Sequence, residues 1–159
     1  MRKLCLSLTL LTLCLLNFPV YSQTDSDTTL LGLPGDNLSL AAVLDLFQKS
    51  KTIEEFEKSL NAKETGINNM DLNKKKKVDF IKVETKKEGE NFKFILQDPV
   101  SESKTQEVGV IHLTKDKDQK VDLKIVGDKK LYGDNYVVKP RTKKTPSTTP
   151  NPAYNGADP

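Results

Sequence analysis

The segment DLNKKKKVDFIKV, which begins at Asp71, spaces its oxygen-bearing side chains as a calcium-binding loop does. In that register Asp71, Asn73 and Asp79 occupy positions one, three and nine, from which EF-hand loops supply ligands to calcium. Carboxylate and amide oxygens are the ligands that this hard cation takes. The spacing therefore predicts a metal site at Asp71, Asn73 and Asp79, resembling the loop of an EF-hand or a dockerin.

The same loop departs from the calcium-binding pattern at three positions. Lys75 replaces an oxygen ligand, Lys76 replaces the glycine of the sharp turn, and Lys82 replaces the bidentate carboxylate. The lysine run also brings ammonium groups near the cation, and unit charges about 4 Å apart repel by about 1 kcal/mol even in water. The alternative is a polar turn before a strand, in which Asp71 and Asn73 accept hydrogen bonds from backbone N–H groups.

His112 is the one histidine of the chain, which limits the catalytic chemistry that the sequence can support. Serine triads and catalytic zinc sites both depend on histidine. Strand alternation places His112 on the same face as Val108, Val110 and Thr114, which indicates a cross-strand packing or surface residue. We therefore predict a protein that is not an enzyme and that has no cofactor.

Residues 1–22 have the pattern of an export signal. Arg2 and Lys3 precede an apolar run from Leu4 to Leu16, and a small residue, Ser22, follows at the end of the segment. We predict cleavage near Ser22 and an exported protein, periplasmic or extracellular.

The alternative to cleavage is a retained membrane anchor, but Asn17 and Pro19 interrupt the apolar run before it reaches the roughly 20 residues of a spanning helix. We therefore predict no integral membrane span after cleavage. Both cysteines, Cys5 and Cys14, lie inside the leader, so the mature chain would have no thiol ligand and no disulfide. Removing the leader leaves 23 basic and 22 acidic side chains. This balance gives no reason to expect a nucleic-acid partner.

The remaining chain divides by composition into three parts. Residues 23–35 form a polar lead-in, and residues 36–139 have enough apolar residues for a single domain with one core. Residues 140–159 are rich in proline and threonine and have few apolar side chains, which predicts a disordered tail.

Two helices are predicted at the start of the domain. In the first, apolar residues recur at helical spacing after a cap at Asp36 or Asn37. The second begins at Thr52, which has the spacing of a capping box with Glu55. The apolar residues of the first helix are Leu40, Val43, Leu44 and Phe47, and those of the second are Ile53, Phe56 and Leu60.

After residue 66 the apolar period changes to the two-residue period of strands. Four runs and a shorter fifth begin at Val78, Phe92, Gln106, Lys120 and Tyr136. Alternation places two sets of apolar residues on one buried face: Phe92, Phe94 and Leu96, and Val121, Leu123 and Ile125. We predict an α+β fold in which the two N-terminal helices pack on a four- to five-stranded antiparallel meander.

A family resemblance covers about residues 30–140 and rests on four segments: LGLPGDNLSLAAVLDLFQKSKTIEEFEKSLN, INNMDLNKKKKVDFIKVE, FILQDP and GDKKLYGDNYVVKP. Together they resemble an uncharacterised group of exported bacterial proteins, in which Asp and Gly often occupy the positions of Lys75 and Lys76. The layout is also similar to small periplasmic modules of the PepSY and outer-membrane assembly lipoprotein types, which bind proteins and do not catalyse. The resemblance implies export and fold class.

These observations predict an exported, non-enzymatic module that binds a protein or polymer of the cell envelope through an open sheet edge or an exposed sheet face. The alternative function is a calcium-responsive structural module that uses the degenerate loop at residues 71–82.

Overall fold

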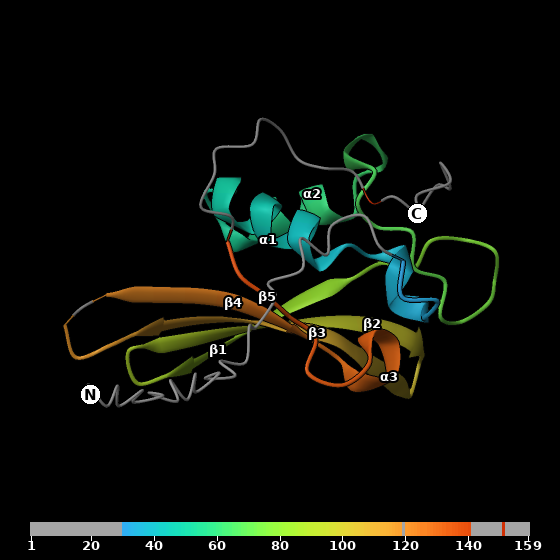
Figure 1. Ribbon diagram of the computed structural model, residues 1–159. Coiled ribbons are helices and arrows are strands. Elements are labelled where there is room, and N and C mark those ends of the chain that lie inside the picture. The colour runs from blue at the N-terminus through green and yellow to red at the C-terminus, as the bar shows by residue number, and fades with distance from the viewer. Residues whose placement is uncertain (1–29, 119, 141–150, 152–159) are drawn as a thin grey trace, which may run out of the picture.

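The computed structural model describes residues 30–118, 120–140 and 151 (Figure 1). The predicted leader, most of the lead-in and most of the predicted tail lie outside these residues. Within the tail, Asn151 is described, and its backbone N–H donates a hydrogen bond to the carbonyl of Gly66 at 3.1 Å. No helix in the described part of the chain is both long enough and apolar enough to cross a membrane.

The described residues form an antiparallel sheet with short helices, which confirms the predicted α+β class (Figure 1). The five strands lie in chain order across the sheet, as in a meander. The helical elements are η1 (Pro34–Asn37), α1 (Leu40–Lys49), α2 (Ile53–Leu60), η2 (Lys63–Thr65) and α3 (Lys129–Tyr132). The strands are β1 (Lys82–Glu88), β2 (Asn91–Ser101), β3 (Lys104–Lys115), β4 (Val121–Gly127) and β5 (Val137–Val138).

The cap of α1 differs from the prediction. Ser39 is the N-cap, and its hydroxyl oxygen accepts a hydrogen bond from the N–H of Ala42 at 3.4 Å. Asp36 and Asn37, the predicted caps, belong instead to η1, where the carboxylate of Asp36 accepts two backbone N–H bonds from the residues before it. The prediction of a cap at Asp36 or Asn37 was therefore wrong, because these side chains stabilise the preceding turn.

The capping signal of α2 is confirmed. The hydroxyl of Thr52 accepts from the N–H of Glu55 at 3.1 Å. The carboxylate of Glu55 reaches back to the N–H of Lys51 at 3.0 Å, one residue before the cap. Caps of this kind stabilise a helix by about 1 kcal/mol. Phe56 and Leu60, from the predicted apolar stripe, are fully buried.

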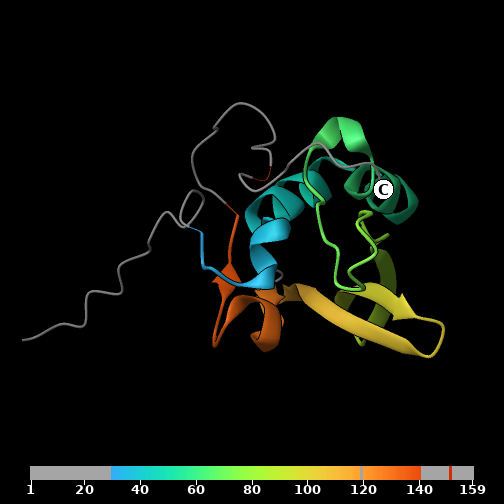
Figure 2. The same cartoon turned by 90° about the vertical axis from the view of Figure 1, so that its right-hand side faces the viewer.

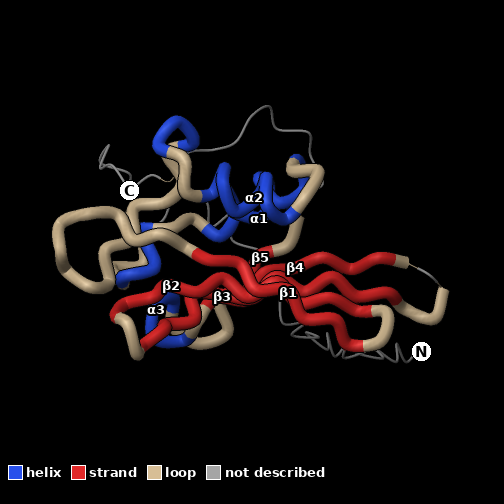
Figure 3. Tube along the Cα trace, turned by 180° about the vertical axis from the view of Figure 1, so that it is seen from behind, coloured by secondary structure: helices blue, strands red, loops and turns tan. Residues whose placement is uncertain are grey.

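Helices α1 and α2 lie over one face of the sheet (Figures 1 and 3). Helix α3 packs against η1, and the hydroxyl of Tyr132 donates to the carbonyl of Leu38 at 2.8 Å. Phe47 of α1 packs between the layers, with its ring centroid 5.3 Å from that of Phe56 and 4.9 Å from that of Phe94 in β2. Five of the six residues predicted for the buried sheet face contribute to this core or pack against it: Phe92, Phe94, Leu96, Leu123 and Ile125. Val121 is exposed.

A β-bulge changes which residues of β3 face the core. The pairing of β2 with β3 shifts beside Leu96, which leaves Val108 as an extra residue in β3. Val108 is fully buried, whereas Val110 and His112 are partly exposed. The predicted common face for Val108 and His112 was therefore wrong, because the bulge interrupts the alternation.

The first strand begins at Lys82, later than the predicted start at Val78. Asn61 accounts for the difference, because its amide bonds both backbone groups of Ile81: Nδ2 donates to the carbonyl and Oδ1 accepts from the N–H, each at 2.8 Å. This backbone is therefore held by a side chain instead of a neighbouring strand. Figure 2 shows the green segment after α2, residues 66–81, running from the helices to the sheet.

Candidate functional site

The predicted metal loop forms the outer part of this segment, and its turn is built from side-chain bonds to the backbone. The carboxylate of Asp71 accepts from the N–H groups of Lys75 at 2.9 Å and Lys76 at 3.0 Å. The side-chain oxygen of Asn73 accepts from the same N–H of Lys75 at 3.0 Å. These are the bonds that the polar-turn alternative predicts.

Lys76 has a left-handed backbone, with φ of 63°. This conformation costs an L-residue with a β-carbon roughly 1–2 kcal/mol, and calcium loops place glycine at the corresponding position. The loop thus keeps the left-handed turn expected there, although a lysine must adopt it. The bond from its N–H to Asp71 stabilises that turn.

Asp79 lies on the buried side of the loop, and its carboxylate binds the loop backbone. It is only 7% exposed, and its Oδ2 accepts from the N–H groups of Leu72 at 2.6 Å and Asn73 at 3.3 Å. The amide Nδ2 of Asn73 also donates to Oδ1 of Asp79. Of the three predicted ligands, the structure therefore brings Asn73 and Asp79 into direct contact, while Asp71 bonds the far side of the turn.

Asp98 of β2 is a fourth polar side chain at this place, which the sequence reasoning missed. It is 0% exposed, and neither of its carboxylate oxygens has a hydrogen-bond partner among the described residues. Its carboxyl group lies against that of Asp79. Burial first, then the charge and the close contact of Asp79, and finally the charge of Asp71 raise the pKa of Asp98 from its ordinary value of 3.8 to about 7.

The signal for Asp98 is present in the sequence. The predicted strand that begins at Phe92 is the run FKFILQ, which ends at Gln97, but β2 continues to Ser101. Extending the alternation of Phe94 and Leu96 by one step would have placed Asp98 on the buried face. Asp98 is a buried aspartate in a strand that faces the predicted metal loop. Its burial is the observation that connects the strand with the loop.

The four consecutive lysines of the loop do not enter this cluster. Lys74, Lys75, Lys76 and Lys77 are all exposed to solvent. Their charges are therefore screened by water from the buried carboxyl groups. In the described part of the chain, no three acidic, histidine or cysteine side chains form a group that could hold a metal ion. Any cation at this place must therefore rely on two carboxylates and on neutral oxygens.

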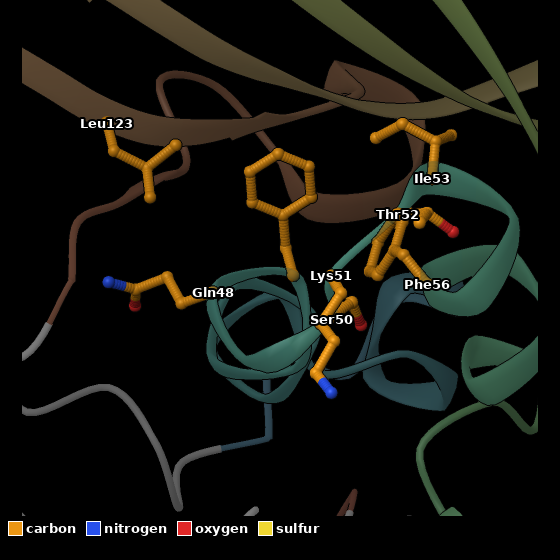
Figure 4. Close-up of a pocket in the computed structure, with 8 residues that line it drawn as sticks. Gln48, Ser50, Lys51, Thr52, Ile53, Phe56 and Leu123 are labelled. Carbon is orange, nitrogen blue, oxygen red and sulfur yellow. The ribbon is translucent and has the colours of Figure 1, made fainter.

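A cavity of about 410 Å³ lies where α1 passes into α2 (Figure 4). The described residues that line it are Phe47, Gln48, Ser50, Lys51, Thr52, Ile53, Phe56 and Leu123. Only Lys51 among them is charged. The cavity is separate from the acidic cluster, and its lining residues include none of the predicted site residues.

The sheet face opposite α1 and α2 has a row of basic side chains. Strand pairing aligns Lys86 with Lys93, Lys93 with His112, and His112 with Lys124 across β1 to β4. Two of the lysines form ion pairs. Nζ of Lys93 lies 2.8 Å from Oε1 of Glu88, and Nζ of Lys86 lies 3.5 Å from Oε1 of Glu84. No ion pair involves Lys124 in the part of the chain that the structure describes.

His112 lies within this basic row. Its pKa is lowered by burial first, and then by the positive charges of Lys124 and Lys93, while Glu88 acts in the opposite direction. The ring is therefore biased towards its neutral form.

Comparison with protein-family models, with curated proteins and with solved structures finds no match to this chain.

Proposed function

We propose that this protein is an exported, non-enzymatic module that binds an anionic protein or polymer of the cell envelope through the sheet face opposite α1 and α2. The observation that carries the proposal is the basic row Lys86, Lys93, His112 and Lys124. An apolar row lies beside it: Val110 and Val126 are partly exposed and Val137 is exposed, while Ile95 in the same row is buried. Basic and apolar side chains side by side suit a partner with negative charge and some apolar surface.

Charge favours the sheet face over the sheet edge as the binding surface. Strand β1 is the outer strand on one side, because it pairs with β2 only. Its sequence, KVETKKE, has lysines at Lys82, Lys86 and Lys87. Charged residues, lysine above all, protect edge strands against pairing with another chain. The β1 edge is therefore protected against pairing with another chain, while the sheet face opposite α1 and α2 presents aligned side chains.

Support for export comes from the leader pattern of residues 1–22. The position of His112 supports a non-enzymatic role, since its partners across the strands are Lys93 and Lys124 and not the carboxylate that orients a catalytic histidine.

Crosslinking in the native envelope, followed by mass spectrometry, tests this proposal. The wild-type protein should give a recurrent crosslinked partner. Lys124→Glu should lose most of that crosslink, because it reverses the charge of a lysine of the row that has no ion pair among the described residues. Lys58→Glu is the matched control, because Lys58 is exposed on α2 on the other side of the sheet. Recovery of the protein alone, or equal losses in both variants, would contradict the proposal.

A second candidate function is a calcium-responsive structural module that uses the loop at residues 71–82. The left-handed backbone of Lys76, at the position where calcium loops have glycine, favours it. Extracellular calcium modules have dissociation constants of about 10⁻⁴–10⁻³ M, so heat on titrating CaCl₂ to about 5 mM is the expected result. No heat at that concentration would remove this candidate.

A further inference from the structure

Asp98 presents an energetic problem that the hydrogen bonds of the fold do not solve. Its side chain is fully buried, and its two oxygens have no hydrogen-bond partner among the described residues. A buried polar group without a partner is destabilising, and an ionised one is more so. The charged group that acts on it most strongly is Asp79, which is also acidic and therefore makes the problem worse.

Asp79 has a different environment, although it lies against Asp98. Its oxygens accept bonds from the N–H groups of Leu72 and Asn73 and from the amide of Asn73. These bonds fix its carboxylate at the base of the loop. The result is a preformed pair of carboxyl groups, one held by the loop and the other held by β2, at a place that Asn73 also reaches.

We propose that Asp79 and Asp98 bind a calcium ion that fastens the loop to the sheet. Asn73 presents its amide Nδ2 to Asp79 and its Oδ1 to the N–H of Lys75, so its oxygen joins the site only when the amide turns over. This inference rests on the calcium-responsive candidate above and identifies its missing ligand. Lys82 occupies the position from which an EF-hand loop supplies its last carboxylate. Asp98, from a strand outside the loop, would supply that carboxylate instead.

The chemistry of the donors favours calcium over other divalent cations. Aspartate and asparagine provide hard oxygen ligands, whereas zinc in proteins is held mainly by cysteine and histidine. Calcium also tolerates irregular coordination and takes backbone carbonyls and water as further ligands, while magnesium requires near-octahedral geometry. A loop that contributes one carboxylate and one amide is therefore better suited to calcium.

Isothermal titration calorimetry with CaCl₂, and with MgCl₂ at matched ionic strength, tests the inference on the purified protein. Wild type should bind one calcium ion with a dissociation constant of about 10⁻⁴–10⁻³ M. Asp98→Asn should weaken that affinity at least about tenfold, because it removes one of two charged ligands. Asp116→Asn is the matched control, since Asp116 is an exposed aspartate that also caps a turn, through the N–H groups of Asp118 and Lys120.

The outcomes separate the inference from the function on which it rests. No calcium binding by wild type would overturn both. Equal calcium binding by wild type and Asp98→Asn would overturn the inference and leave the calcium-responsive function standing. Carboxyl-carbon NMR of the wild-type protein gives the same decision without a variant: calcium should shift the signals of Asp79 and Asp98 and leave that of Asp116 in place. Signals of Asp98 that do not move would overturn the assignment.

Discussion

Two buried polar pairs hold residues 66–81 in place, and they differ in how their hydrogen bonds are satisfied. Asn61 and Asn68 lie on the side of α2, and Asp79 and Asp98 lie on the side of β2. Each amide of the first pair has partners for donor and acceptor atoms. In the second pair, Asp98 has none among the described residues.

The asparagine pair is self-sufficient because an amide both donates and accepts. Asn61 donates to the carbonyls of Glu57 and Ile81, and its oxygen accepts from Ile81 and from Asn68. Asn68 in turn donates to the carbonyl of Asp79 at 2.8 Å. Such a pair needs nothing from outside the chain, which indicates a structural role.

Two carboxylates can only accept hydrogen bonds, so the aspartate pair requires something that the described residues do not provide. A proton or a cation between Asp79 and Asp98 would meet that requirement. Burial alone therefore does not distinguish a structural polar pair from a binding site. The distinguishing property is whether the donors and acceptors within the pair balance.

Asn61→Ala is expected to have the largest effect on stability. The substitution leaves the backbone groups of Ile81 and Glu57 without their buried partner, which should lower the free energy of unfolding by about 3 kcal/mol. Chemical denaturation of wild type and Asn61→Ala measures this difference in the free energy of unfolding. Asn37→Ala is the control, because Asn37 is partly exposed, and it should cost less than about 1 kcal/mol. Equal losses would show that the asparagine pair is not the stabilising element described here.

The pH dependence of stability should come from the aspartate pair. Because the pKa of Asp98 is about 7 in the folded protein and 3.8 ordinarily, the folded state retains a proton that the unfolded chain releases between these values. Its contribution is fully present below about pH 4 and is lost as the pH rises through about 7. In calcium-free buffer the free energy of unfolding should therefore fall as the pH rises over that range.

Asp98→Asn should remove this part of the pH dependence, because the amide does not titrate. Denaturation curves of both proteins at several pH values provide the comparison. The same slope in wild type and Asp98→Asn would mean that another group is responsible.

A smaller effect should follow from restoring a ligand in the loop. Lys75 occupies position five, which supplies a side-chain oxygen in calcium loops, whereas position seven, Lys77, supplies its backbone carbonyl. Lys75→Asp should therefore strengthen calcium binding by about tenfold, or about 1.4 kcal/mol. Lys77→Asp makes the same change in charge and should strengthen calcium binding by a smaller factor. Calorimetry that finds equal gains would assign the effect to charge alone.

Local signals in the sequence predicted the parts of the fold that depend on neighbouring residues. The capping box of Thr52 and Glu55 is an example, because its bonds span three residues. The alternation of apolar residues that includes Phe94 in one strand and Ile125 in another is a second example, because it is visible within the sequence of each strand. These features could be predicted because their physical causes lie within one element.

Features that depend on distant residues were missed. The late start of β1 follows from the bonds of Asn61 to Ile81, twenty positions further along the chain. The burial of Val108 follows from pairing with β2. Asp98 was overlooked as a site residue because its importance comes from Asp79, on a different element. The loop residues Asp71, Asn73 and Asp79 could be identified from their spacing, whereas strand alternation could indicate the burial of Asp98 but not its proximity to Asp79.

A crystal structure of the protein grown in CaCl₂ would show whether Asp79 and Asp98 share a calcium ion. We expect an ion with oxygen ligands at about 2.3–2.6 Å, among them a carboxylate oxygen of Asp79 and one of Asp98. Electron density that shows the two carboxyl groups in direct contact, with no ion between them at saturating calcium, would contradict it.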